Sequence, residues 1–152
     1  TELGTGDPTG DIPDRIYPSE AIESMAKDCD YLVLIVPLTD STKHMINESV
    51  LEAMKETAIL INIARGGVVD EKALITALSS GKIGGAALDV FEEEPLPSTS
   101  PLWNLDNVII TPHMSGFTKD YHKKAAKVFK ENLKRYLDNR PLLNQLNRKK
   151  GY

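Results

Sequence analysis

Four short apolar runs, separated by segments with helical spacing, constrain the fold of this chain more than any other feature. The runs have the length of strands and stand at 31–36, 58–63, 85–90 and 108–111. Apolar residues three and four positions apart predict helices that begin at Ser19, Asn47, Asp70 and Thr118, the last ending near Asp138. Because the first two runs lack polar alternation, we expect strands that are covered on both faces. This order predicts the α/β class, with a doubly wound parallel sheet.

The composition narrows the classes of partner and the compartment. A formal net charge of -4 over 152 residues leaves no basic footprint for nucleic acid or an anionic membrane. No apolar run approaches the ~20 residues that a membrane-spanning helix needs. The single cysteine, Cys29, permits no internal disulfide, so we expect a reducing compartment, the cytoplasm.

Charged side chains follow three of the four predicted strands. Arg65 follows the second strand, and His113 follows the fourth. Asp89 lies at the end of the third strand, and Glu94 comes after it. Parallel sheets bind ligands beyond the carboxyl ends of their strands, so we expect these groups at one edge. A histidine can transfer a proton near neutral pH, a nearby carboxylate favours its charged form, and an arginine suits a substrate carboxylate. Together they predict proton transfer on a small alcohol or ketone that bears a carboxylate.

Each of these residues also has a structural interpretation. An arginine before two glycines is often a solvated turn residue, and a lone histidine after a strand often has a surface or capping role. The glutamates at 92–94 form a charge run of the kind that is usually solvated. Asp89 ends a buried strand, where a structural cap is the alternative. Surface positions or ordinary packing are predicted for residues outside any motif: His44, His122, Cys29 and Trp103.

The glycines between Gly4 and Gly10 only loosely imitate a dinucleotide-binding loop. A true loop of this kind follows a strand and opens a helix, so that the pyrophosphate meets the helix N-terminus. No strand pattern precedes Gly4, and no helical pattern follows Gly10. Residues 1–18 also contain three prolines, so we expect an irregular loop there.

Three blocks of sequence stand in order along the chain: Ile63–Glu71 (IARGGVVDE), Gly85–Pro95 (GAALDVFEEEP) and Thr111–Gly116 (TPHMSG). They resemble three signatures of the D-isomer-specific 2-hydroxyacid dehydrogenases, and the similarity extends from about Tyr17 to the C-terminus. Three blocks in the right order and spacing are far more specific than any one alone. The resemblance implies a Rossmann-like nucleotide-binding domain with NAD or NADP as cofactor.

The resemblance also implies a role for each motif residue. Arg65 would bind the substrate carboxylate and carbonyl, and His113 would exchange a proton with the carbonyl oxygen. Glu94 would pair with His113, and Asp89 would hold the nicotinamide end of the cofactor. No metal site is expected. The positions that match cofactor contacts in the family are Val36, Pro37, Thr42, Ile63, Ala64, Arg65, Asp89, His113, Ser115 and Gly116.

The resemblance covers a nucleotide-binding domain that is incomplete at its N-terminal side. The family's first strand, its G-x-G-x-x-G turn, the following helix and the second strand are not found, so we expect this chain alone to bind the cofactor weakly. The residue that separates NAD from NADP normally ends that second strand. We expect an irregular loop at 1–18, a partial nucleotide-binding domain at 19–140, and a tail at 141–152 that returns toward a substrate domain.

Two functions of different classes follow. The first is an oxidoreductase that transfers a hydride between NAD(P) and a small 2-oxo or D-2-hydroxy acid of the glyoxylate or hydroxypyruvate type. The alternative is a truncated, non-catalytic homologue that acts as an interaction or dinucleotide-sensing module, or simply a fragment of a normal enzyme. The missing glycine loop favours the alternative, whereas the presence of Arg65, Glu94 and His113 favours the enzyme. An exposed sheet edge and apolar face predict a homo-oligomer, a dimer.

Overall fold

The computed structural model describes residue 7 and residues 9–148. Its strands are β1 (Tyr31–Leu34), β2 (Ile59–Asn62), β3 (Gly85–Leu88) and β4 (Val108–Ile110). Its α-helices are α1 (Ile22–Asp28), α2 (Glu48–Ala53), α3 (Glu71–Ser79) and α4 (Tyr121–Leu137). Three short 3-10 helices complete the elements, η1 (Ser19–Ala21), η2 (Gly66–Val68) and η3 (Pro101–Asn104).

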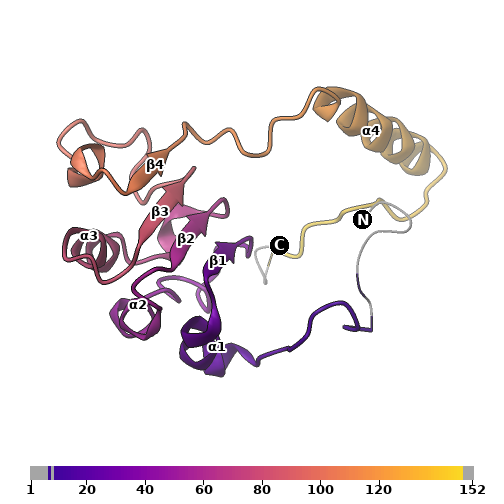
Figure 1. Ribbon diagram of the computed structural model, residues 1–152. Helices are drawn as coiled ribbons and strands as arrows, with labels where there is room; N and C mark the ends of the chain where they lie inside the picture. The colour runs from indigo at the N-terminus through magenta and orange to yellow at the C-terminus, as the bar shows by residue number, and fades with distance from the viewer. Residues whose placement is uncertain (1–6, 8, 149–152) are drawn as a thin grey trace.

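The four strands form one parallel sheet in chain order, β1-β2-β3-β4 (Figure 1). Tyr31 pairs with Ile59, and Ile59 pairs with Gly85, so the first three strands start level with one another. β4 joins one residue later, with Val108 opposite Ala86. All four carboxyl ends therefore lie at one edge, which confirms the predicted α/β class and the Rossmann-like parallel arrangement.

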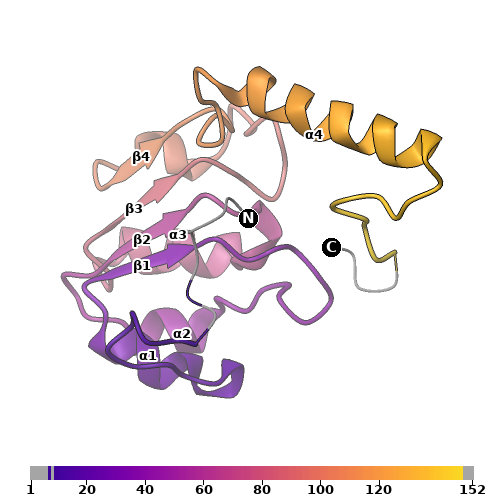
Figure 2. The same ribbon diagram turned by 90° about the vertical axis from the view of Figure 1, so that its right-hand side faces the viewer.

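One face of the sheet is covered and the other is open. Helices α1, α2 and α3 lie on a single side, and the view in Figure 2 looks onto the opposite, uncovered side. Buried and exposed residues consequently alternate along β1, where Leu32 and Leu34 are buried while Tyr31 and Val33 are exposed. The prediction that this strand is covered on both faces is therefore wrong for the described chain. Its apolar run fits a two-sided core, but no described helix packs on the second side.

Local side-chain acceptors set the starts of two helices as predicted. Asn47 Oδ1 accepts a hydrogen bond from the Val50 N–H at 3.1 Å and begins α2. Asp70 Oδ1 accepts from the Ala73 N–H at 3.1 Å and begins α3. α3 ends at Ser79 with Ser80 as its C-cap, and Gly81 follows with a φ of 72°, which glycine adopts without strain.

Other predicted boundaries shift by a few residues. Ser19 begins the 3-10 helix η1 and makes no side-chain cap, so α1 starts only at Ile22. α4 starts at Tyr121 because a turn, closed by the Tyr121 N–H and the Thr118 carbonyl at 3.0 Å, occupies the positions before it. Each strand ends one or two residues earlier than its apolar run, since pairing stops where the chain turns into the loops.

The hydrophobic core lies between the covered face of the sheet and helices α1 to α3. Full burial of one large apolar side chain contributes about 1.5–3 kcal/mol to folding. The largest fully buried apolar side chains are Ile46, Leu51, Met54, Leu60, Leu74, Ile83, Leu102, Val50 and Val68. Among the described residues only three polar side chains are buried, Asn62, Asp89 and Ser100. The first two lie at the carboxyl edge of the sheet, where a buried polar group needs a specific partner.

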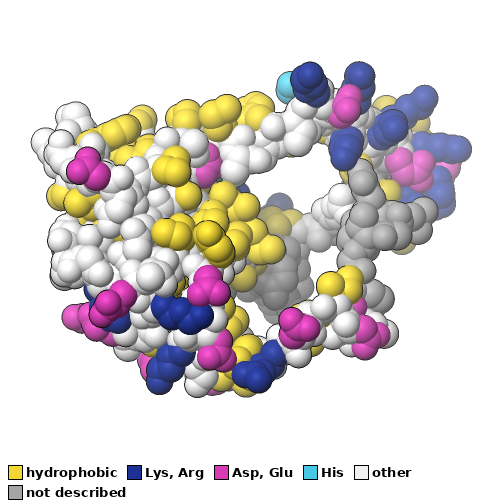
Figure 3. Space-filling view, in the orientation of Figure 1, with side chains coloured by type: hydrophobic (Ala, Val, Ile, Leu, Met, Phe, Trp, Pro, Cys, Tyr) yellow, Lys and Arg dark blue, Asp and Glu magenta, His cyan; other side chains and the backbone are white. Residues whose placement is uncertain are grey.

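Helix α4 stands apart from the sheet, as Figures 1 and 2 both show. None of its residues is buried, and its predicted apolar stripe, which includes Phe129 and Tyr136, is exposed. Lys and Arg side chains gather on the rest of its surface (Figure 3). Within the part of the chain that the structure describes, no helix combines the length and the apolar character needed to cross a membrane.

The two ends of the chain are described only in part. Residues 1–6 and 8 lie outside the described residues, and with them most of the glycine-bearing segment from Gly4 to Gly10. Residues 9–18 contain neither helix nor strand. The predicted tail at 141–152 is described as far as residue 148. The predicted division into three segments stays a prediction.

Candidate active site

The turn after β2 presents Arg65 at the carboxyl edge of the sheet. Asn62, the last residue of β2, accepts the Ala64 N–H at 3.1 Å and donates its side-chain N–H to the Arg65 carbonyl at 3.1 Å. Arg65 has an extended backbone, with φ -147° and ψ 146°. Its side chain is exposed and makes one hydrogen bond, from Nη1 to the Ala64 carbonyl at 2.6 Å. Among the described residues no carboxylate lies within ion-pair distance of this guanidinium.

Gly66 brings the turn after β2 against the chain that follows β3. A Cβ at Gly66 would lie 1.9 Å from the carbonyl carbon and oxygen of Phe91 and 2.4 Å from the Glu92 nitrogen. Real Cβ atoms do not approach backbone so closely, so this contact requires glycine. The glycine thereby places Arg65 beside the segment that carries Glu94.

Asp89, the residue that follows β3, organises the loop after β4. Its carboxylate is buried and accepts the hydroxyl of Thr111, the Met114 N–H at 2.8 Å and the Ser115 N–H at 2.9 Å. Its carbonyl accepts the His113 N–H at 2.9 Å. Burial raises the pKa of Asp89, but hydrogen bonds from Thr111, Ser115 and Met114 outweigh it and hold the pKa well below its usual range. Asp89 therefore acts as a cap for the His113 loop, and it lines none of the hollows at this edge.

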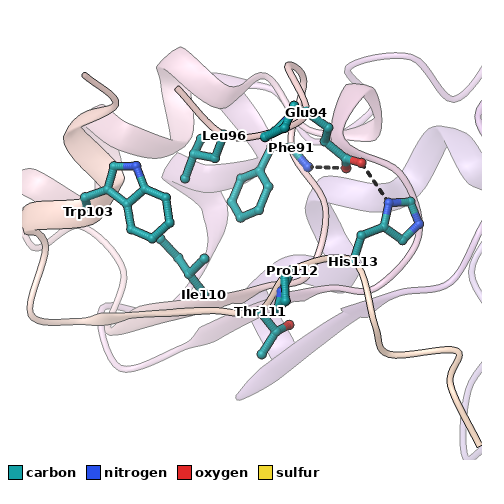
Figure 4. A pocket seen from close by; sticks show the side chains of 9 residues that line it. Phe91, Glu94, Leu96, Trp103, Ile110, Thr111, Pro112 and His113 are labelled. Atoms are coloured by element: carbon teal, nitrogen blue, oxygen red, sulfur yellow. Dashed lines mark hydrogen bonds and ion pairs between the residues drawn. The ribbon is translucent and has the colours of Figure 1, made fainter. Parts of the chain in front are cut away.

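His113 and Glu94 form a direct pair. His113 Nδ1 lies 2.7 Å from Glu94 Oε2, and Glu94 Oε1 accepts the Phe91 N–H at 3.0 Å (Figure 4). Burial raises the pKa of Glu94, but the hydrogen bonds from His113 and Phe91 and the nearby charges of His113 and Arg65 lower it overall. An ionised Glu94 makes Nδ1 the protonated nitrogen. The second ring nitrogen then points away from Glu94 and is free to exchange a proton.

His113 holds this position with a left-handed backbone, φ 51°, which histidine tolerates better than most residues. Such strained conformations persist where surrounding contacts impose them. Here those contacts are the hydrogen bonds to Asp89. These hydrogen bonds thus hold the His113 loop against the end of β3.

The three predicted catalytic residues line one hollow. Arg65, Glu94 and His113 surround a space of about 500 Å³ together with Gly66, Gly67 and Phe91. The hollow combines an arginine and a histidine ring nitrogen that have no carboxylate partner among the described residues with a carboxylate that fixes the histidine. This set can bind an anionic group and move a proton.

Most of the predicted cofactor residues line two neighbouring hollows that share Ile63 and Arg65. Val36, Pro37 and Ala64 line the first, of about 490 Å³, and Ser115 and Gly116 line the second, of about 370 Å³, together with His113. Thr42 lines neither hollow. Its hydroxyl donates to the Pro37 carbonyl at 2.7 Å and accepts the Thr39 N–H at 2.8 Å, so it shapes the loop after β1.

A larger apolar pocket lies on the other side of the Glu94–His113 pair. Its volume is about 670 Å³, and Figure 4 shows Phe91, Leu96, Trp103 and Ile110 around it. Trp103 is half exposed and donates its ring N–H to the Pro97 carbonyl at 2.9 Å. The prediction of ordinary packing for Trp103 is therefore only partly right, because the indole forms a pocket wall that is open to solvent.

Two contacts at this edge were not predicted from the sequence. Asn62 is polar within the apolar run ILIN, the same signal that drew attention to Asp89. His44 Nε2 lies 2.7 Å from Glu92 Oε1, across 48 positions of sequence, and no local pattern indicates such a pair. Glu92 thus has a partner and is not merely solvated, while His44 is half exposed at the surface as predicted.

Substitution of Asp89 by Asn is expected to lower the free energy of unfolding at pH 7 by roughly 2 kcal/mol or more, since charged acceptors are lost from buried N–H groups. The folded-state pKa of Asp89 is depressed, so its contribution is present above the ordinary value of 3.8 and is lost as the pH falls below it. The difference between the two proteins, measured by urea unfolding at a series of pH values, should therefore shrink toward acid. A difference that stays constant from pH 7 to pH 3 would contradict this role.

Comparison with known proteins identifies the family. The sequence profile of the D-isomer specific 2-hydroxyacid dehydrogenase NAD-binding domain matches residues 7–115. The chain belongs to this family, as its three sequence blocks predicted.

Two curated relatives show how much of a longer protein the chain represents. A glyoxylate reductase of Pyrococcus furiosus is 52% identical over 112 residues, which are 74% of this chain and 33% of that protein. A D-3-phosphoglycerate dehydrogenase of Methanocaldococcus jannaschii is 47% identical over 132 residues, 83% of this chain and 25% of that protein. The chain thus spans a quarter to a third of these relatives.

Solved structures agree with this assignment. A D-isomer specific 2-hydroxyacid dehydrogenase of Xanthobacter autotrophicus Py2, in complex with NADPH and MES, superposes with a TM-score of 0.81 at 44% identity, covering 88% of this chain and 54% of that one. An NADPH-dependent glyoxylate/hydroxypyruvate reductase of Sinorhizobium meliloti, in complex with NADP and sulfate, gives a TM-score of 0.80 at 30% identity, covering 90% and 44%. At these identities the likeness extends beyond the fold to the family.

Proposed function

We propose that the protein carrying this chain is an NAD(P)-dependent oxidoreductase that reduces a small 2-oxo acid, glyoxylate or hydroxypyruvate, to its D-2-hydroxy acid. The observation that carries the proposal is the single hollow shared by Arg65 and the Glu94–His113 pair. The glyoxylate reductases among its relatives support this choice of substrate.

Arg65 binds the substrate carboxylate in this proposal. The guanidinium lacks a carboxylate partner among the described residues and offers a planar set of N–H donors that matches a carboxylate. Its one hydrogen bond, to the Ala64 carbonyl, leaves the remaining donors available. Because the carboxylate is fixed there, the adjacent 2-oxo group lies within the same hollow as His113.

His113 supplies the proton. Glu94 accepts from the Nδ1–H, so the proton that can be transferred sits on the other ring nitrogen of the imidazolium. As negative charge develops on the carbonyl oxygen during reduction, His113 donates this proton and becomes neutral. In the reverse direction the neutral imidazole removes the proton from the hydroxyl group, and Glu94 stabilises the imidazolium that forms.

The two hollows beside Ile63 fit the nicotinamide end of a dinucleotide. Their walls combine apolar side chains, among them Ile35 and Phe117, with polar ones, among them Arg65 and Ser115, and a planar ring that carries an amide group can use both kinds of contact. When bound, nicotinamide supplies or accepts the hydride at the substrate carbon. Val36, Pro37, Ile63, Ala64, Ser115 and Gly116 would contact it, whereas Asp89 and Thr42 would act through the loops they hold. The neighbours crystallised with NADPH or NADP support this placement.

A direct assay tests this function in the protein that carries the chain. Purified protein is mixed with NADH or NADPH and with glyoxylate or hydroxypyruvate, and the loss of reduced nicotinamide is followed by absorbance. We expect oxidation with at least one pair, and the D-isomer as the product of hydroxypyruvate. Binding of the nucleotide without oxidation in any pair would instead support the alternative, a non-catalytic dinucleotide-sensing module.

We also propose that the protein forms a homodimer in the cytoplasm. The apolar side chains of Tyr31, Val33 and Ile109 lie exposed on one sheet face, and an exposed apolar face favours association. Light scattering at micromolar concentration should give twice the mass of one chain. A monomeric mass would refute the dimer and leave the proposed chemistry untouched.

A further inference from the structure

Asn62 is a buried amide at the carboxyl end of β2, in an otherwise apolar strand. Asn62 is only 1% exposed. Its side chain accepts a hydrogen bond from the Ala64 N–H and donates one to the Arg65 carbonyl. A buried amide costs free energy unless its donors and acceptors are paired. Both bonds go to the turn that carries Arg65, so this side chain serves that turn.

The backbone of Asn62 connects the same turn to the His113 loop. The Asn62 carbonyl accepts the Asp89 N–H at 3.0 Å, and the Asp89 carbonyl accepts the His113 N–H at 2.9 Å. A continuous path of hydrogen bonds therefore runs from Arg65 through Asn62 and Asp89 to His113. The relative placement of Arg65 and His113 depends on both buried polar residues.

We propose that Asn62 is a positioning residue for Arg65. It holds the Arg65 backbone in the extended conformation that places the guanidinium in the hollow of Glu94 and His113, and it touches neither substrate nor cofactor. An amide suits this task because it carries a donor and an acceptor on one planar group. The inference rests on the proposed role of Arg65 in binding the substrate carboxylate.

Two variants of different chemistry test the proposal in the protein that carries this chain. Asn62→Leu has a similar volume and removes both hydrogen bonds. Asn62→Asp keeps the acceptor for the Ala64 N–H and removes the donor to the Arg65 carbonyl. For both we expect KM for glyoxylate to rise roughly 10- to 100-fold, the range that follows misplacement of a binding group by about 1 Å. The Kd for the reduced nucleotide should change by less than about threefold, because a positioning residue for Arg65 leaves most cofactor contacts intact.

Hydrogen exchange provides a readout besides activity. The Ala64 amide should exchange faster in Asn62→Leu, which lacks its acceptor, and should stay protected in Asn62→Asp. The control is Leu60→Ala, a fully buried apolar position two residues earlier in the same strand. This control should lower the free energy of unfolding by about 2–5 kcal/mol and leave KM unchanged.

A further variant, Arg65→Gln, separates this inference from the proposed function, because its KM for glyoxylate tests the role of Arg65 directly. If Arg65→Gln raises KM while both Asn62 variants leave it unchanged, the positioning role is overturned and the function stands. If Leu60→Ala raises KM as much as the Asn62 variants do, Asn62 is merely structural and the inference fails. If Arg65→Gln leaves KM unchanged, the proposed role of Arg65 fails and this inference fails with it.

Discussion

Replacement of His113 by Ala is expected to lower kcat for 2-oxo acid reduction about 100- to 10,000-fold, the usual contribution of a positioned acid or base. The loss follows from the 2.7 Å pair with Glu94, which fixes the ring and leaves its second nitrogen to donate the proton. The measurement is steady-state turnover with saturating reduced nucleotide and glyoxylate. The nucleotide Kd should change little, because His113 forms only part of one of the two cofactor hollows.

The matched control for this experiment is His122→Ala. His122 lies on α4, is exposed, stands edge-on to Tyr121 with the ring centroids 5.6 Å apart, and lines none of the hollows that contain Arg65, Glu94 or His113. Its removal should leave kcat within about twofold, as is usual for surface positions without a special contact. Equal losses in the two variants, or no loss in His113→Ala, would remove His113 from the mechanism.

Of the glycine-to-alanine substitutions in the site, Gly66→Ala is expected to lower both stability and activity the most. The new Cβ would lie 1.9 Å from the Phe91 carbonyl group, so the turn after β2 and the chain after β3 must move apart. We expect the free energy of unfolding to fall by about 3 kcal/mol, the upper end of the usual cost of overpacking. Because the same movement separates Arg65 from Glu94, kcat/KM should fall roughly 100-fold.

Gly67→Ala gives the matched comparison, one residue further along. Its Cβ would meet only the Leu38 side chain, at 3.4 Å, an ordinary contact. Urea unfolding should show a change of less than about 1 kcal/mol for this variant. If Gly66→Ala and Gly67→Ala unfold at the same urea concentration, close packing at Gly66 is not what joins the two loops.

The order of strands and the helix starts could be predicted because they depend on local pattern. Asn47 and Asp70 each cap a helix by accepting the N–H three residues ahead, so the signal and its partner are close in sequence. Ser19 carries the same signal but makes no cap, because the chain first forms a 3-10 turn there. The apolar run of β1 led to the wrong prediction of cover on both faces, since such a run does not show what packs against it, whereas the incomplete resemblance predicted an exposed apolar face.

The candidate site could be predicted as a set of residues but not as a network. Arg65, Glu94 and His113 meet because parallel strands end at the same edge, which sequence order alone implies. The resemblance assigns Asp89 to the nicotinamide end of the cofactor, which stays a prediction, but it does not show that the carboxylate accepts the Met114 and Ser115 N–H groups. Hydrogen bonds between distant loops leave no periodic signal, whereas Asn62 bonds to its own turn and is marked in the sequence as a polar residue within an apolar strand.

The most direct test of the central claim is a crystal structure of the protein that carries this chain, bound to a reduced nicotinamide nucleotide and oxamate, an unreactive analogue of a 2-oxo acid. The account predicts that the oxamate carboxylate accepts hydrogen bonds from the Arg65 guanidinium. It also predicts that the oxamate carbonyl oxygen lies about 2.7–3.2 Å from His113 Nε2. Oxamate bound away from Arg65, or a His113 ring whose Nε2 faces away from the carbonyl oxygen, would contradict it.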